Sequence, residues 1–229
     1  HILFIILFFI TTICLPSLST SLAIDQQKKS IDSDQLILPQ ITIIDQRLVL
    51  YKRPSFPQPE SGYPIIFLLH GAAQYPFSWF LPLNNWNKEQ LTFTKTLLDE
   101  GFFVIAPSSG RPMRPGPHAW GSYIDDVNDS KDLQLFDYLF QWLDNRSYEL
   151  NVEQMYSCGF SSGGFMTSRL AKVFPDKFVK VIIHSGTDAD LISFTRFGPD
   201  FDCESAIEYE KDHPPVLIVH GKQDKIVPF

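Results

Sequence analysis

Residues 156 to 166, which read Tyr-Ser-Cys-Gly-Phe-Ser-Ser-Gly-Gly-Phe-Met, decide the fold. Within them, Gly159-x-Ser161-x-Gly163 has the pattern of a nucleophile elbow, a tight strand-to-helix turn that exposes a serine hydroxyl. Glycines flank the serine because a side chain at Gly159 or Gly163 would collide with neighbouring backbone. A pattern this short also arises by chance, so the segments on either side of it decide its meaning.

These flanking segments fit a strand and a helix. Residues 155 to 158 form a short apolar run suited to a strand. Residues 162 to 174 carry apolar side chains at helical spacing: Phe165, Met166, Leu170 and Val173. The sequence therefore predicts strand, turn and helix in that order, which is the arrangement that an exposed nucleophilic serine needs.

Apolar runs alternate with amphipathic segments along the rest of the chain. Buried strands are expected at residues 64–69, 102–106, 178–183 and 215–219, and a strand or hairpin arm at 41–51. Helices are expected at 85–100 and 131–143, the second of them capped by Asn128 or Asp129. The alternation predicts an α/β fold, with a mostly parallel central sheet and helices on both faces. Functional side chains then belong at the carboxyl ends of the strands.

The bulk properties fit one large domain. The chain has 229 residues, which is enough for an α/β domain with a substantial core. Its formal net charge is −7, which argues against binding nucleic acid through the phosphates.

The first residues resemble a targeting segment. The chain opens at His1, runs almost wholly apolar from Ile2 to Leu15, and continues into small residues ending at Ser21-Leu22-Ala23, which fits a cleavage site. We expect a partial signal peptide at 1–23, a linker at 24–40 and the folded domain at 41–229, in a secreted protein that leaves the membrane after cleavage. A membrane anchor is the alternative interpretation of the same segment.

Three conspicuous features fall at carboxyl ends of predicted strands. One is the turn at Ser161. Another is His70-Gly71-Ala72-Ala73, directly after the strand at 64–69. The third runs from His220 to Pro228, directly after the strand at 215–219. Strands of a parallel sheet end at a common edge, so we expect all three features to lie close together.

With these features the chain resembles the α/β-hydrolases, and more narrowly the secreted esterases of the polyhydroxybutyrate depolymerase and feruloyl esterase type. The matching segments are Leu69 to Ala72, Gly159 to Met166, Phe174 to Phe178, His184 to Gly186, and His220-Gly221-x-x-Asp224-x-x-Val227-Pro228. Together they span residues 62 to 229. The resemblance implies hydrolysis of carboxylic esters through an acyl-enzyme, with no metal or cofactor.

The resemblance also implies roles for individual residues. Ser161 is the expected nucleophile, and Asp224 the acid that orients the catalytic histidine. The N–H groups of Ala72 and Ser162 are the expected oxyanion hole. The remaining loop residues support this geometry: His70, Gly71, Gly159 and Gly163. Asp188 and Asp190 are fallback candidates for the acid, and Asp224 could instead be a turn residue.

One part of the pattern is missing. In this fold the histidine follows the acid in the sequence, yet only five residues follow Asp224 and none of the six histidines is among them. We therefore expect a sequence truncated at both ends, whose absent part carries the catalytic histidine. We also expect this polypeptide alone to be nearly inactive, with the strand at 215–219 left as an exposed sheet edge.

Two further alternatives concern what the protein does. The fold could belong to a serine peptidase resembling prolyl oligopeptidase, which shares the His-Gly-x-x-Asp ending. It could also be a catalytically inactive α/β-hydrolase fold used for binding. The absence of an N-terminal propeller or other large accessory domain argues against the peptidase. The intact pattern around Ser161 and the oxyanion loop argue against the binding protein.

Cysteines and aromatic residues each allow two interpretations. Cys158 and Cys203 could form a disulfide in an oxidising compartment, or Cys158 could be a small apolar residue of a buried strand. Aromatic side chains in the loops could line an apolar pocket or pack into the core: Tyr75, Phe77, Trp79, Phe80, Trp86, Trp120 and Tyr123.

Overall fold

The computed structural model describes residues 37–82, 87–110, 119–195, 198–201, 212–224 and 226–227. The expected signal peptide and most of the expected linker lie outside these residues. The first strand begins at Gln40. Ile37, just before it, is 8 % exposed and belongs to the core.

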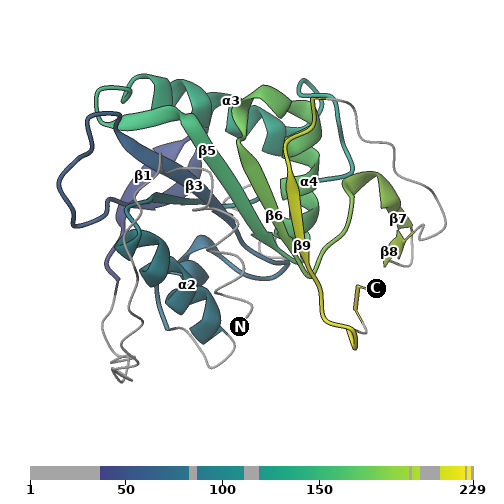
Figure 1. Cartoon of the computed structure of the whole chain (residues 1–229). Coiled ribbons are helices and arrows are strands. Elements are labelled where there is room, and N and C mark those ends of the chain that lie inside the picture. Colours follow the sequence, from purple (N-terminus) through teal and green to yellow (C-terminus); the bar gives the residue numbers. More distant parts are fainter. Residues whose placement is uncertain are drawn as a thin grey trace.

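A seven-stranded sheet forms the centre of the molecule (Figure 1). Its strands are β1 (Gln40–Ile44), β2 (Arg47–Lys52), β3 (Tyr63–Leu69), β4 (Phe103–Pro107), β5 (Leu150–Phe160), β6 (Lys180–His184) and β9 (Val216–Val219). They lie in the order β1-β2-β4-β3-β5-β6-β9. In this order, β4, β3, β5, β6 and β9 are mutually parallel. Strands β1 and β2 form an antiparallel hairpin, and β2 pairs antiparallel with β4. The expected mostly parallel sheet is confirmed.

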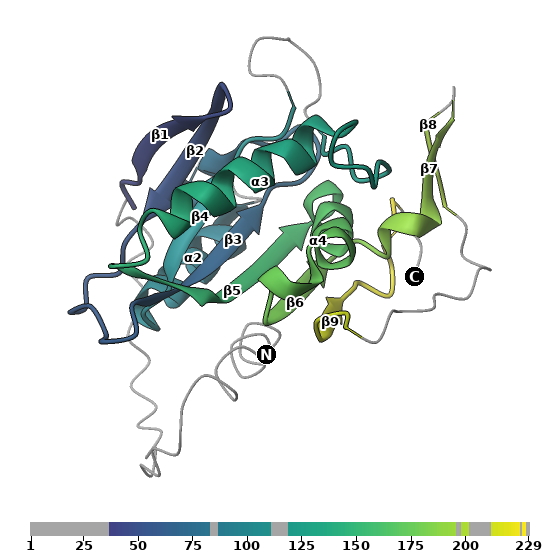
Figure 2. The ribbon, with the colours of Figure 1, turned by 90° about the horizontal axis from the view of Figure 1, so that it is seen from above.

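Helices cover both faces of this sheet, as the sequence predicts. Helix α2 (Lys88–Asp99) and the short helix η1 (Pro76–Trp79) pack on one face. Helices α3 (Lys131–Asp144) and α4 (Ser162–Val173) pack on the other. Figure 2 shows α3 and α4 side by side on the near face, with α2 behind the sheet. Two shorter helices follow α4 along the chain, η3 (Pro175–Lys177) and η4 (Ala189–Leu191).

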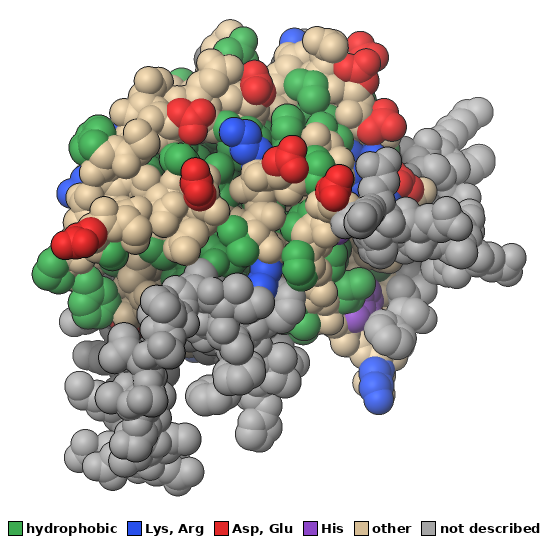
Figure 3. Space-filling view, turned by 45° about the horizontal axis from the view of Figure 1, so that its top comes forward, with side chains coloured by type: hydrophobic (Ala, Val, Ile, Leu, Met, Phe, Trp, Pro, Cys, Tyr) green, Lys and Arg blue, Asp and Glu red, His purple; other side chains and the backbone are tan. Residues whose placement is uncertain are grey.

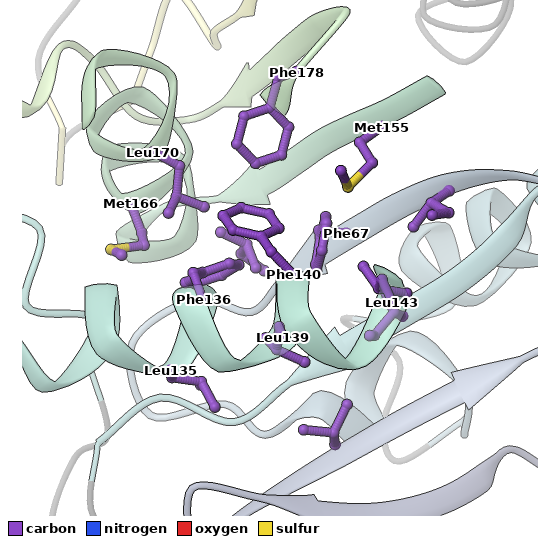
Figure 4. Close-up of a cluster of buried hydrophobic side chains, with 14 of the residues drawn as sticks. Phe67, Leu135, Phe136, Leu139, Phe140, Leu143, Met155, Met166, Leu170 and Phe178 are labelled. Carbon is purple, nitrogen blue, oxygen red and sulfur yellow. The ribbon is translucent and has the colours of Figure 1, made fainter. Parts of the chain in front are cut away.

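The core beneath α3 contains a group of aromatic rings among Leu and Met side chains (Figure 4). The ring of Phe67 on β3 lies 5.6 Å from that of Phe136 and 6.1 Å from that of Phe140, both on α3. Phe178, just before β6, closes the group at 5.9 Å from Phe140. These side chains are at most 5 % exposed, so their burial supplies much of the force that holds α3 on the sheet.

Several boundaries differ from those that the sequence predicts. Helix α3 is capped by Ser130, whose Oγ accepts from the N–H of Leu133 at 3.2 Å, so the prediction of Asn128 or Asp129 as the cap was wrong. Asn128 instead bonds to Asp126 within the preceding turn. Strand β5 starts at Leu150, five residues earlier than expected, because its polar first half pairs with the start of β3 across a register shift.

A second, two-stranded sheet lies in the segment between β6 and β9. Its strands are β7 (Ile192–Thr195) and β8 (Gly198–Phe201), which pair antiparallel. These strands are not predicted by the sequence pattern. In Figure 2 this hairpin stands away from the main sheet, beyond α4.

The visible surface is mixed in character. Figure 3 shows acidic side chains spread over the face that carries α3, with hydrophobic and polar atoms between them. Among the residues that the structure describes, no helix combines the length and the apolar character needed to cross a bilayer.

Candidate active site

Ser161 lies in a strained turn between β5 and α4. Its backbone has φ 53° and ψ −118°, a region that residues with side chains rarely adopt. Its N–H donates to the carbonyl oxygen of His184 on the neighbouring β6, at 2.8 Å. The predicted strand, turn and helix are therefore present, with the serine at the carboxyl end of a central strand.

Two glycines make this turn sterically feasible. A Cβ atom built on Gly159 would lie 1.9 Å from the carbonyl oxygen of Gly163. A Cβ atom on Gly163 would lie 2.3 Å from the carbonyl oxygen of Leu69 at the end of β3. Contacts this short are with backbone, which cannot move aside, so only glycine fits. The second contact also shows that the start of α4 is pressed against the end of β3.

Two backbone N–H groups at this edge have no hydrogen-bond acceptor among the described residues. One belongs to Ser162, the first residue of α4, where helix geometry leaves the N–H unpaired. The other belongs to Ala72, in the turn that follows β3. An anion at this edge would find donors from two adjacent elements, together with the partial positive charge of a helix N-terminus.

His70 is buried beneath the turn that carries Ala72. Its Nε2 accepts from the N–H of Ser109 at 3.1 Å, which leaves the ring proton on Nδ1. Nδ1 then donates to the carbonyl oxygen of Gly71 at 2.8 Å. Both ring nitrogens are thus engaged with backbone groups, and His70 is 1 % exposed. This arrangement suits a residue that orders the loop.

Trp120 joins the β3 loop to the start of α4. Its indole N–H donates to the carbonyl oxygen of His70 at 2.9 Å. Its backbone N–H donates to the Oγ of Ser162 at 3.0 Å. The sequence analysis placed Trp120 only among the loop aromatics, because nothing in its local sequence marks contacts with residues 42 and 50 positions away.

Asp224 lies in the loop after β9, on the other side of Ser161 from Ala72. Its Oδ1 accepts from the N–H groups of Ile226 at 2.9 Å and Val227 at 3.0 Å. These bonds stabilise the carboxylate and hold the pKa of Asp224 below its usual value. Val227 packs on Phe165 in the first turn of α4, which fixes this loop beside the serine.

Two histidines border the same loop. The Nε2 of His220 lies 3.7 Å from Oδ2 of Asp224 and 2.9 Å from the carbonyl oxygen of Val227, while its Nδ1 lies 3.3 Å from the carbonyl oxygen of Gly186. His184, at the end of β6, lies against the ring of Phe160. Burial, and then the nearby charge of His220, hold the pKa of His184 below its usual value despite the opposing effect of Asp224.

The two fallback acids are engaged elsewhere. Asp188 is buried and bonds to Lys172 of α4 at 2.6 Å. Asp190 pairs with Arg169 at 2.7 Å and also contacts Lys172. These bonds and charges, opposed by partial burial, lower the pKa of Asp190. Both acids therefore tie the segment after β6 to α4.

Cys158 is a free thiol within the described part of the chain. Its proposed partner, Cys203, lies outside the described residues. Cys158 is 3 % exposed on β5, inside the cluster beneath α2. Burial among apolar side chains raises its pKa to about 12, as expected of an inert core thiol.

The loop aromatics divide into two groups. Trp79, Phe80 and Trp120 are at most 3 % exposed and belong to the core. Tyr75 and Tyr123 are about half exposed, and Phe77 is partly buried against the core. Trp86 lies outside the described residues. The described residues contain no cluster of His, Cys, Asp and Glu side chains able to hold a metal ion.

Two characterised proteins are similar in sequence. One is a poly(3-hydroxyoctanoate) depolymerase of Pseudomonas fluorescens, 32% identical over 197 residues that cover 82% of this chain and 66% of the relative. The other is feruloyl esterase B of Thermothelomyces thermophilus, 26% identical over 74% of this chain and 62% of the relative. The chain thus spans slightly less than two thirds of the length of each. No protein-family model matches it.

Solved structures agree on the fold. An acetyl xylan esterase from Aspergillus awamori superposes with a TM-score of 0.61 at 17% identity, covering 83% of this chain and 74% of the other. Est1E from Butyrivibrio proteoclasticus gives a TM-score of 0.53 at 17% identity, covering 83% and 80%. Together with the strand order and the turn at Ser161, these similarities show that the chain has the α/β-hydrolase fold, and its sequence is similar to those of the depolymerase and the feruloyl esterase.

Proposed function

We propose that the protein is a serine hydrolase that cleaves carboxylic esters through an acyl-enzyme. The observation that carries this proposal is the placement of Ser161, in a strained turn at the carboxyl end of β5, at the same sheet edge as two N–H donors that have no acceptor among the described residues. Strain and unpaired donors cost stability and are retained where a reaction uses them. The esterase names of the two sequence relatives support the same chemistry.

The reaction follows from this geometry. The Oγ of Ser161 attacks the ester carbonyl carbon while its proton passes to a histidine base. Negative charge then develops on the carbonyl oxygen, which accepts from the N–H groups of Ala72 and Ser162. The carbonyl re-forms as the alcohol leaves with the proton from the histidine. Water, deprotonated by the same base, releases the acid and restores Ser161.

Asp224 is proposed as the carboxylate that orients this base. It is held as an anion by two backbone N–H groups, at the end of the strand next to β6. The order nucleophile, acid, histidine that is typical of this fold places the base C-terminal to Asp224 in the full-length protein. His70 and His220 have both ring nitrogens directed at backbone groups, which suits them to supporting the loops.

The acyl and alcohol groups are proposed only as a class. Esters of hydroxyalkanoate polymers and of feruloylated polysaccharides are the two candidates that the names of the relatives suggest. Secretion is part of the same proposal and depends on the apolar segment from Ile2 to Leu15. Sequencing the N-terminus of protein recovered from culture medium tests it, and a mature start near Ile24 is expected.

A covalent probe tests the reaction directly. The full-length protein should react with a fluorophosphonate, and peptide mapping should place the adduct on Ser161. Ser161→Ala should abolish labelling and lower the turnover of p-nitrophenyl butyrate by about 10⁴-fold or more. Ser147→Ala, at an exposed serine after α3, is the control and should leave both unchanged.

The same assay separates the competing functions. Ser161-dependent turnover of a peptide amide would point to a peptidase. Intact folding without any adduct at Ser161 would point to a binding protein and would refute the proposed esterase.

A further inference from the structure

We propose that Gln74 is a positioning residue that fixes the direction of the Ala72 N–H toward the substrate oxyanion. This inference rests on the proposed function and adds a residue to its machinery. Gln74 has no role in the sequence patterns discussed above, and it follows the His-Gly-Ala-Ala segment directly.

Gln74 makes two hydrogen bonds to Gly71 in the turn after β3, one through its side chain and one through its backbone. Its side-chain Oε1 accepts from the N–H of Gly71 at 2.9 Å. Its backbone N–H donates to the carbonyl oxygen of the same Gly71 at 3.2 Å. The two peptide planes that flank Gly71 are therefore both tied to one residue.

The second bond bears on catalysis because a peptide unit is planar. The carbonyl group of Gly71 and the N–H of Ala72 belong to one trans peptide and point in opposite directions. Whatever holds the Gly71 oxygen therefore also aims the Ala72 N–H. That oxygen accepts from the N–H of Gln74 on one side and from Nδ1 of His70 on the other.

The turn would not hold this shape without help. Ala73 has φ 60°, in the left-handed region that alanine avoids, so the free loop favours other conformations. The side chain of Gln74 holds the loop against these other conformations. Gln90 of α2 holds the Gln74 side chain in turn, since its Nε2 donates to the same Oε1 at 3.3 Å. Two donors converge on that atom, which identifies it as the amide oxygen.

The chain offers a matched set of variants. Gln74→Met keeps the length of the side chain but removes the acceptor for the Gly71 N–H. Gln74→Glu keeps an acceptor at the same place. Gln58→Met is the control, because Gln58 also bonds to a backbone group, the carbonyl oxygen of Tyr148 at 2.8 Å, near the opposite ends of the strands.

We expect Gln74→Met to lower kcat by about 10- to 100-fold with KM changed by less than about threefold, since a misdirected donor weakens mainly the transition state. A boronic acid that forms a tetrahedral adduct on Ser161 should lose affinity by a similar factor. Gln74→Glu should keep kcat within about fivefold of the wild type. Gln58→Met should change neither quantity.

The outcomes separate this inference from the proposed function. If Ser161-dependent turnover is present and Gln74→Met retains both kcat and boronate affinity, the positioning role is wrong while the esterase stands. A rise in KM without a fall in kcat for Gln74→Met also overturns the positioning role. So does a fall in kcat for Gln58→Met that equals the fall for Gln74→Met. If the full-length wild-type protein, which includes the residues C-terminal to Asp224, shows no Ser161-dependent turnover, both proposals fail. Should Gln74→Met unfold, a Gln74→Glu variant that folds but loses boronate affinity refutes the role.

Discussion

At the scale of single residues, the site depends on two glycines, whose lack of a side chain allows close backbone contacts. Gly159 and Gly163 let three backbone segments meet at distances that any Cβ atom would prevent. The consequence is a serine whose hydroxyl stands at the end of the sheet with helix α4 starting directly behind it. Gly221, in the loop after β9, carries no such constraint. A Cβ atom on Gly221 meets nothing within 4 Å.

This difference gives a prediction for a pair of variants. Gly163→Ala should lower the free energy of unfolding by about 3 kcal/mol or more, because its Cβ would overlap the backbone of Leu69. Gly221→Ala should change it by less than about 0.5 kcal/mol. Urea unfolding measures both. Equal stability of the two variants would mean that β3 and α4 are not in close contact.

At the scale of elements, α3 is the main helix on the face that also carries α4. Its apolar side packs on β3 through aromatic rings, and its first turn begins at a buried Ser130. The Oγ of Ser130 satisfies the N–H of Leu133, one of the donors that helix geometry leaves unpaired. The cap is thus inside the fold, where water cannot replace it.

Ser130→Ala should therefore destabilise the protein by about 1 to 2 kcal/mol, towards the upper end of the range for lost caps. Ser130→Asp, whose carboxylate can accept from the same N–H, should retain more of the stability. Thermal unfolding of the two variants provides the measurement. If both melt like the wild type, Ser130 is not the cap.

At the scale of the whole molecule, one buried ion pair joins strand β2 of the sheet to the helical layer and to the site. Arg47 on β2 contacts Asp132 in the first turn of α3, and both are at most 7 % exposed. Asp132 also accepts from the N–H of Gly110 at 3.3 Å and of Gly121 at 2.6 Å. Gly121 adjoins Trp120, so this carboxylate also anchors the segment that bonds to Ser162.

We expect Asp132→Asn to cost about 3 to 5 kcal/mol of unfolding free energy, since it leaves the guanidinium of Arg47 buried without a counter-charge. The double variant with Arg47→Met should recover part of that loss, because it removes the uncompensated charge. A chemical unfolding cycle of the wild type, the two single variants and the double variant tests this. A double variant as unstable as the sum of the single variants would show that the ion pair is not coupled.

The sequence predicted the strands that are buried on both faces, because continuous apolar runs between polar loops have one stable environment in an α/β fold. It did not predict the polar first half of β5 or the hairpin β7–β8. Those segments pair through backbone hydrogen bonds that do not depend on an apolar pattern. The cap at Ser130 was also missed, since three consecutive capping residues offer the same local signal and only the packing of α3 selects one.

For the site, the sequence by itself determined the elbow at Ser161, because a serine between two glycines at a strand end is a local steric pattern. Only the tertiary structure decided that Asp188 and Asp190 are tied to α4, that Cys158 lies in the core, and that Gln74 and Trp120 bond to the neighbouring loops. Each of these depends on groups that meet through strand order and loop packing, which the spacing of residues along the chain does not encode.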